Sequence, residues 1–210
     1  MKYVHFTRVV LAVSFAAGLT QCQQAPQEDA ATAEPASERI TLQPAAEYSY
    51  TAAGKEYVTA AFGALSSQLK AALQEGGPTH AISFCNERAL PLTDSLSKHY
   101  GVQIKRVSNK YRNPANKANE YEVELIDKYA VRSLDGQELL PDLFYQESSV
   151  VAYYPIQMGG LCLTCHGAEG TEVTAEVGEA LAKHYPNDLA KGYAVGDIRG
   201  LWAVEMPKKQ

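Results

Sequence analysis

The chain has 210 residues, of which 46% are hydrophobic and 20% charged, the composition of a globular protein rather than of a disordered or fibrous one. Its formal charge is -5 at pH 7. Removing residues 1–21, whose only charged side chains are Lys2 and Arg8, makes the remainder more acidic still. This balance argues against a nucleic-acid partner, because binding to DNA or RNA needs a basic face.

Residues 1–21 are predicted to be an export signal. A positively charged start is followed by an apolar run, Val9 to Leu19, which is too short to span a membrane comfortably. The residues before Cys22 resemble a bacterial lipoprotein signal, although Gln21 stands where Gly, Ala or Ser is usual. Ordinary signal cleavage near Cys22 is the alternative. We expect a periplasmic protein that lipid at Cys22 anchors to a bacterial membrane, with no transmembrane helix in the mature chain.

Residues 22–47 are predicted to be a disordered tether, because they are rich in Ala, Gln, Pro and Glu and lack a sustained period. Residues 48–210 then form one domain. Its first helix is predicted over 51–75, from an apolar stripe made of Val58, Phe62, Leu65, Leu69 and Leu73. Gly76, Gly77 and Pro78 end this helix.

A second helical stripe follows and is made of Ile82, Cys85, Ala89, Leu92 and Leu96. It directs Cys85 toward the core, and Pro91 is expected to bend or divide the helix. Strands are predicted over 102–107, 148–156 and 201–206, and further helices over 121–129 and 174–184. The order of these elements predicts an α+β fold with an antiparallel sheet.

Residues 162–166 read Cys-Leu-Thr-Cys-His, the attachment signature of c-type haem. Positions i, i+3 and i+4 share a face of a helical turn, so two thiols add to vinyl groups at one porphyrin edge while the histidine binds the iron. We predict one covalent haem c on Cys162 and Cys165, with His166 as an axial iron ligand. The alternatives are a thioredoxin-like redox pair and a zinc site of Cys85, Cys162, Cys165 and His166. The adjoining histidine and the export signal favour haem.

The residues alone leave the second axial ligand open. The candidates are Cys85, His80, His99, His184, Met158 and Met206. Cys85 is favoured, because a solitary cysteine in an oxidising compartment needs an explanation and an iron-bound thiolate provides one. A buried, inert thiol is the alternative. Met158 precedes Cys162 by one helical turn and is expected near the ring, if only as a wall of the pocket.

Four stretches, in order, resemble a family of bacterial single-haem c-type proteins with a PAS-like fold, which occur alone or as the sensor part of histidine kinases. They are CNERA at 85–89, RVS…RNPxN at 106–116, CLTCHG at 162–167, and the Tyr- and Gly-rich run 185–200. The resemblance implies a PAS-like antiparallel sheet with flanking helices and an N-terminal helix, and axial ligation by His166 and Cys85. Arg106, Arg112 and Arg199 recur in these stretches and are expected to contact haem propionates or to form structural pairs.

These features favour a mono-haem electron-transfer protein that works with a separate redox partner. The alternative is a haem-based redox or gas sensor that signals through another protein. An enzyme such as a peroxidase is not expected, because no distal acid–base set is visible in the sequence.

Overall fold

The computed structural model describes residues 44–208. The predicted export signal, the lipid site at Cys22 and the predicted tether therefore lie outside the described residues, except for 44–47, which begin the first helix. Within the described part of the chain, no helix has both the length and the apolar character that crossing a membrane requires.

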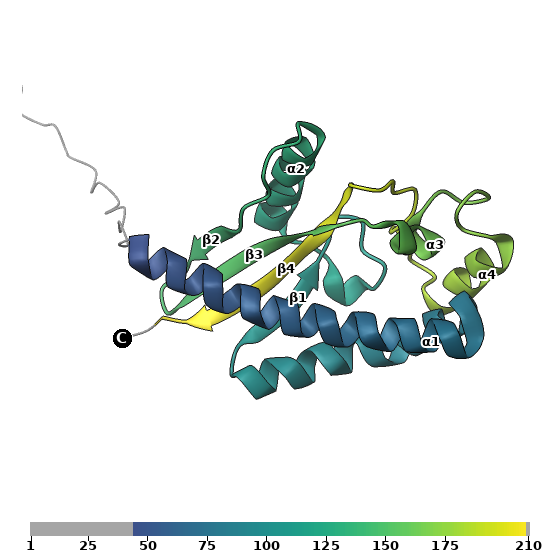
Figure 1. Cartoon of the computed structure of the whole chain (residues 1–210), viewed down its shortest axis with the longest axis horizontal. Coiled ribbons are helices and arrows are strands. Elements are labelled where there is room, and N and C mark those ends of the chain that lie inside the picture. Colours follow the sequence, from purple (N-terminus) through teal and green to yellow (C-terminus); the bar gives the residue numbers. More distant parts are fainter. Residues whose placement is uncertain (1–43, 209–210) are drawn as a thin grey trace, which may run out of the picture. The chain divides into compact units, whose positions relative to one another are not determined.

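Helix α1, Pro44–Tyr100, is a helical hairpin (Figure 1). Gly76 and Gly77 leave helical geometry, and Gly77 adopts φ 70°, a left-handed conformation that favours glycine. A first arm, 44–75, and a second arm, 78–100, run back along each other, with the Tyr57 and Tyr100 rings 4.8 Å apart. The predicted end of the first helix is confirmed. The second arm runs undivided through Pro91, since the non-helical angles are confined to the two glycines.

The described residues form one four-stranded antiparallel sheet in the order β1-β4-β3-β2. Its strands are β1 Gln103–Val107, β2 Asp142–Tyr145, β3 Ser149–Gln157 and β4 Ile198–Pro207. The predicted α+β class with an antiparallel sheet is confirmed. Strand β2 was not predicted, because it is short, lies at an edge and carries no run of buried residues.

Helices cover both faces of the sheet. Helix α2, Glu120–Leu134, packs Leu125, Ile126 and Tyr129 on one face, and it begins with a capping box between Asn119 and Glu122. The two arms of α1 pack on the other face. Two short helices, α3 Leu163–His166 and α4 Ala175–His184, follow β3, and α4 contacts α1 near the tip of its hairpin (Figure 1).

The apolar stripe of the first arm lies slightly away from its predicted position. Phe62, which was placed on the stripe, is 58% exposed, whereas its neighbour Ala61 is fully buried. Gly54 shows the reason: a Cβ there would lie 2.5 Å from Tyr154 Oη and 3.2 Å from Ala152 Cβ. Small residues let the helix approach the sheet closely. The prediction considered only large apolar side chains, so it did not locate the face of the helix that contacts the sheet.

Replacing Gly54 with alanine is expected to destabilise the protein by about 1–3 kcal/mol, because the new methyl group meets the buried Tyr154 ring. Gly63→Ala is the matched control, since a Cβ at Gly63 meets nothing within 4 Å. Gly63→Ala, in the same helical arm, should raise the stability of the protein by about 0.5–1 kcal/mol. Urea unfolding of both variants measures this, and equal stabilities would contradict the close approach.

Candidate haem site

The predicted haem motif forms a single helical turn. A short 3-10 segment, Gly160–Cys162, runs directly into α3, and both Cys162 and Leu163 have helical backbone angles. The two thiols and the imidazole of the motif therefore share one face. Gly167 closes the turn by donating its N–H to Leu163 O at 2.8 Å. A Cβ at Gly167 would lie 2.7 Å from that same oxygen, so a glycine is needed here.

His166 is held so that one ring nitrogen is committed to the protein. Its Nδ1 lies 2.9 Å from the carbonyl oxygen of Ala190. A carbonyl only accepts hydrogen bonds, so Nδ1 carries the proton and Nε2 keeps its lone pair free for a metal. Burial, reinforced by Arg112 and Arg199, holds the pKa of His166 well below its usual range. The imidazole is therefore neutral at pH 7, which is the form that binds iron.

Cys85 lies on the second arm of α1, on the side that faces the motif. Ile82, one turn earlier on this arm, packs in a cluster that Cys165 and Tyr185 adjoin. Burial raises the pKa of Cys165, Arg112 opposes the rise, and Cys85 adds to it, which places the two thiols near each other. Burial also raises the pKa of Cys85, while Arg106 and Arg112 act in the opposite direction.

Arg112 fastens the motif to the loop that follows α4. Its Nη2 donates to the carbonyl oxygen of Cys165 and, at 3.1 Å, to that of Ala190. Its Nε donates to Asp188 Oδ2 at 3.0 Å, and the Asp188 side chain is only 3% exposed. One guanidinium thus fixes the second cysteine of the motif and the carbonyl that orients His166. This supports the structural alternative for Arg112 rather than a contact with a propionate.

The comparisons with known proteins cover most of the chain, including this site. The profile of the Tll0287-like family matches residues 23–207. The chain belongs to the Tll0287-like family. The crystal structure of the cyanobacterial heme-protein Tll0287 matches with a TM-score of 0.53 and 26% sequence identity, covering 80% of this chain and 99% of that chain. No curated protein matches the chain. The resemblance inferred from the sequence is confirmed for this family, while the PAS-like description of the sheet stays a prediction.

The arrangement in this Tll0287-like chain suits a haem better than a zinc ion. Zinc needs its four ligands around one point, each about 2.0–2.3 Å from the metal. Among the described residues, no three His, Cys, Asp or Glu side chains lie close enough together to hold a metal ion. A haem makes the opposite demand, because its two axial ligands face each other across a ring and its two thioether cysteines meet only the ring edge. His166 lies on α3 and Cys85 on α1, so these two donors come from separate elements.

The other predicted axial candidates lie elsewhere or serve in packing. His80 follows the turn of the α1 hairpin and has a side chain 41% exposed. His99 is exposed near the end of the second arm, and Met206 is buried in the core between α1 and the sheet. His184 ends α4, and its carbonyl accepts a hydrogen bond from Asn86 at 3.0 Å.

Met158 lies beside the motif, and its predicted place near the haem ring stays a prediction. Its side chain is 4% exposed and packs with Ala190 and Tyr193, against Cys162 and Leu163. Met158 thus adjoins Ala190, whose carbonyl orients His166. This position is consistent with Met158 packing in the wall of the site.

Sequence reasoning missed three members of this site, namely Asp188, the Ala190 carbonyl and Tyr193. All three lie in the stretch 185–200, whose order carried the family resemblance. Backbone pairing brings the stretch to the motif, since Gly192 N donates to Gly167 O and Tyr193 N to His166 O, each at 2.9 Å. The order of the residues in this stretch indicated the family. No spacing rule, however, predicts that Asp188, the Ala190 carbonyl and Tyr193 belong to the site.

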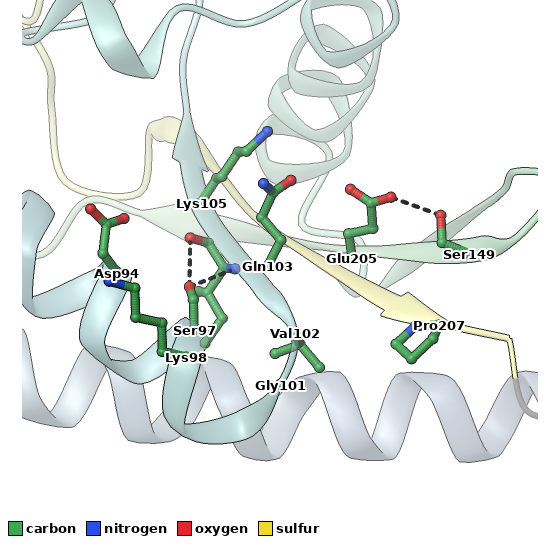
Figure 2. Close-up of a pocket in the computed structure, with 11 residues that line it drawn as sticks. Asp94, Ser97, Lys98, Gly101, Val102, Gln103, Lys105, Ser149, Glu205 and Pro207 are labelled. Carbon is green, nitrogen blue, oxygen red and sulfur yellow. Dashed lines mark hydrogen bonds between the residues drawn. The ribbon is translucent and has the colours of Figure 1, made fainter.

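A separate hollow of about 570 Å³ lies at the other end of the sheet (Figure 2). The end of the second arm of α1, the start of β1 and the end of β4 line it, including Asp94, Lys98, Lys105 and Glu205. None of the predicted site residues lines this hollow. Its charges are mixed, and Glu205 already accepts a hydrogen bond from Ser149 Oγ at 2.8 Å.

Replacing Asp188 with asparagine is expected to destabilise the protein by about 3–5 kcal/mol, because it leaves the largely buried Arg112 without its counter-charge. Glu169→Gln is the control, since it breaks the exposed pair with Lys191 in the same part of the molecule. That change should cost less than about 1 kcal/mol. Urea unfolding at one pH compares the stabilities of the two variants. Similar losses of stability would contradict a special role for the Arg112 clamp, meaning the contacts of Arg112 with Asp188 and with the carbonyls of Cys165 and Ala190.

Proposed function

We propose that this protein binds one haem c covalently through Cys162 and Cys165, with His166 and Cys85 as axial iron ligands, and transfers electrons. The observation that carries the proposal is the helical turn on which both thiols share a face with a histidine, whose Nδ1 is bound to the Ala190 carbonyl. Membership of the family that includes the cyanobacterial heme-protein Tll0287 supports it. When bound, the haem would supply a one-electron redox couple.

The protein's own residues favour electron transfer by holding the site rigid. Arg112 ties the motif to the Ala190 carbonyl, and that carbonyl fixes the ring of His166. Ligands that move little between oxidation states make electron exchange easier. Donation from a Cys85 thiolate would stabilise ferric iron, so we expect a reduction potential below that of His/Met cytochromes.

We further propose that the protein is exported, lipid-anchored at Cys22 in the periplasm, and paired with a separate redox protein. The supporting observation is the positively charged and apolar start of the chain, which ends just before Cys22. We assign it no catalysed reaction.

Protein produced with a c-type haem maturation system should stay coloured by haem stain on a denaturing gel. The variant Cys162→Ser/Cys165→Ser should lose the stain, because no thioether can form. Cys85→Ser is the control, since it also removes a thiol and should keep the stain. A colourless wild-type band with stoichiometric zinc would overturn the haem proposal.

Cys85→Ala should keep the covalent haem and change the ferric iron from low spin to high spin, because the sixth position loses its protein ligand. Electron paramagnetic resonance of the ferric protein measures this. Met158→Leu is the control, because Met158 serves in packing and should leave the spin state unchanged. An unaltered Cys85→Ala spectrum would remove Cys85 from the coordination sphere.

A sensor of redox state or of a small gas is the second candidate function, and the placing of Cys85 favours it. Cys85 belongs to α1, whereas His166 belongs to the clamped turn α3, so one ligand can leave without moving the other. A carbon monoxide complex of the ferrous wild-type protein would support sensing. An unchanged ferrous spectrum under carbon monoxide would leave electron transfer as the function.

A further inference from the structure

Arg106 is a largely enclosed cation for which the described residues provide no acidic partner. It projects from β1, and its guanidinium lies 5.8 Å from the centre of the Trp202 ring. Within residues 44–208 it has no hydrogen bond and no ion pair. Burial lowers its pKa, while Cys85 and Tyr185 act in the opposite direction, so both groups lie within electrostatic range of the guanidinium. An arginine with five N–H donors is seldom enclosed without an acceptor.

Arg199, on the neighbouring strand, has neutral partners. Its Nη1 donates to Ser108 Oγ at 2.7 Å and to Lys110 O at 2.9 Å, and neither carries a negative charge. Burial is the largest effect and lowers its pKa, Tyr193 and Asp188 raise it, and Arg112 and Arg106 lower it because their guanidinium groups repel that of Arg199. Among the described residues, only Asp188 forms an ion pair with any of the three, and its partner is Arg112. The cluster therefore has an excess of positive charge.

Tyr193 adds an unused hydroxyl to this cluster. The residue is 7% exposed, and its hydroxyl oxygen is buried without a hydrogen-bond partner among the described residues. Its ring stands edge-on to His166 with centroids 6.3 Å apart, and the Arg199 guanidinium lies 5.6 Å from the ring centre. A buried hydroxyl without a partner is uncommon, and it points to an acceptor that a ligand supplies.

We propose that Arg106, Arg199 and Tyr193 bind the two propionate carboxylates of the haem. This inference rests on the proposed function, because it takes haem as the ligand. Propionates are the anionic groups of haem, and a carboxylate enclosed in protein needs cationic and hydroxyl donors. Tyr193 and Arg199 adjoin each other and form one donor set, and Arg106, which lies over the Trp202 ring, forms the other. Arg112 is not included, since Asp188 and two backbone carbonyls already engage it.

The hydroxyl of Tyr193 is tested by Tyr193→Phe in the haem-loaded protein, since phenylalanine keeps the ring and removes only the donor. The propionate bending band in the resonance Raman spectrum should shift, because its frequency follows hydrogen bonding to the carboxylate. Tyr121→Phe is the control and should leave the band in place, because the Tyr121 hydroxyl lies on α2 and bonds Asp142. An unshifted band in Tyr193→Phe would overturn the role of Tyr193.

The charge of Arg106 is tested by the midpoint potential of the haem. Arg106→Gln should lower it, because an uncompensated carboxylate favours the ferric state, and Arg106→Lys should restore most of the loss. Arg88→Gln removes an exposed charge from the Cys85 arm and should change the potential much less. Equal effects of Arg106→Gln and Arg88→Gln would overturn the role of Arg106.

The two proposals fail differently in these experiments. A wild-type protein without covalent haem stain contradicts the proposed function itself. A stained, six-coordinate protein whose Raman band and potential ignore both substitutions contradicts only the propionate assignment.

Discussion

The site depends on one buried interaction, the contact of Arg112 with Asp188 and with two backbone carbonyls. Those carbonyls belong to Cys165, within the motif, and to Ala190, which orients His166. Segments distant in the sequence therefore meet at one guanidinium, and among residues 44–208 no apolar cluster joins all of them. A planar group with five donors in a fixed fork performs this task, whereas a lysine has a single ammonium and cannot reproduce the geometry. The local helical turn places the thiols, and Arg112, together with the backbone hydrogen bonds of Gly192 and Tyr193, fixes where that turn lies.

This clamp also explains why the surrounding charge is unbalanced. Arg106 and Arg112 lie close enough to Arg199 to lower its pKa, and among the described residues Asp188 forms an ion pair only with Arg112. Such an arrangement costs folding free energy in the chain alone and is relieved when an anionic ligand binds. The polypeptide is therefore stabilised by the group it is proposed to bind. The proposed covalent attachment through Cys162 and Cys165 would make that stabilisation permanent.

Local patterns in the sequence were enough to predict most helices and strands, because the stripes and alternation arise within a few residues. They also predicted a haem motif at Cys162, Cys165 and His166, and the structure places these three residues on one helical turn. The sequence patterns failed where contacts with residues from a distant segment determine the burial or the partner of a side chain. Phe62 is exposed because Gly54 and Ala61 set the line of contact with the sheet. Edge strand β2, the Asp188 partner of Arg112 and the Tyr193 hydroxyl are likewise products of tertiary pairing, which a single sequence without its fold does not reveal.

The two proposed axial ligands are held in unequal ways, and this bears on the choice between electron transfer and sensing. His166 is fixed by its own hydrogen bond and by the Arg112 clamp next to it. Cys85 depends on the packing of the second arm of α1, with one nearby tie from Asn86 to the end of α4. A displacement of that arm would change Cys85 while leaving His166 in place. If the iron ever exchanges a ligand, the exchange belongs on the Cys85 side, and the hairpin of α1 is the element that would register it.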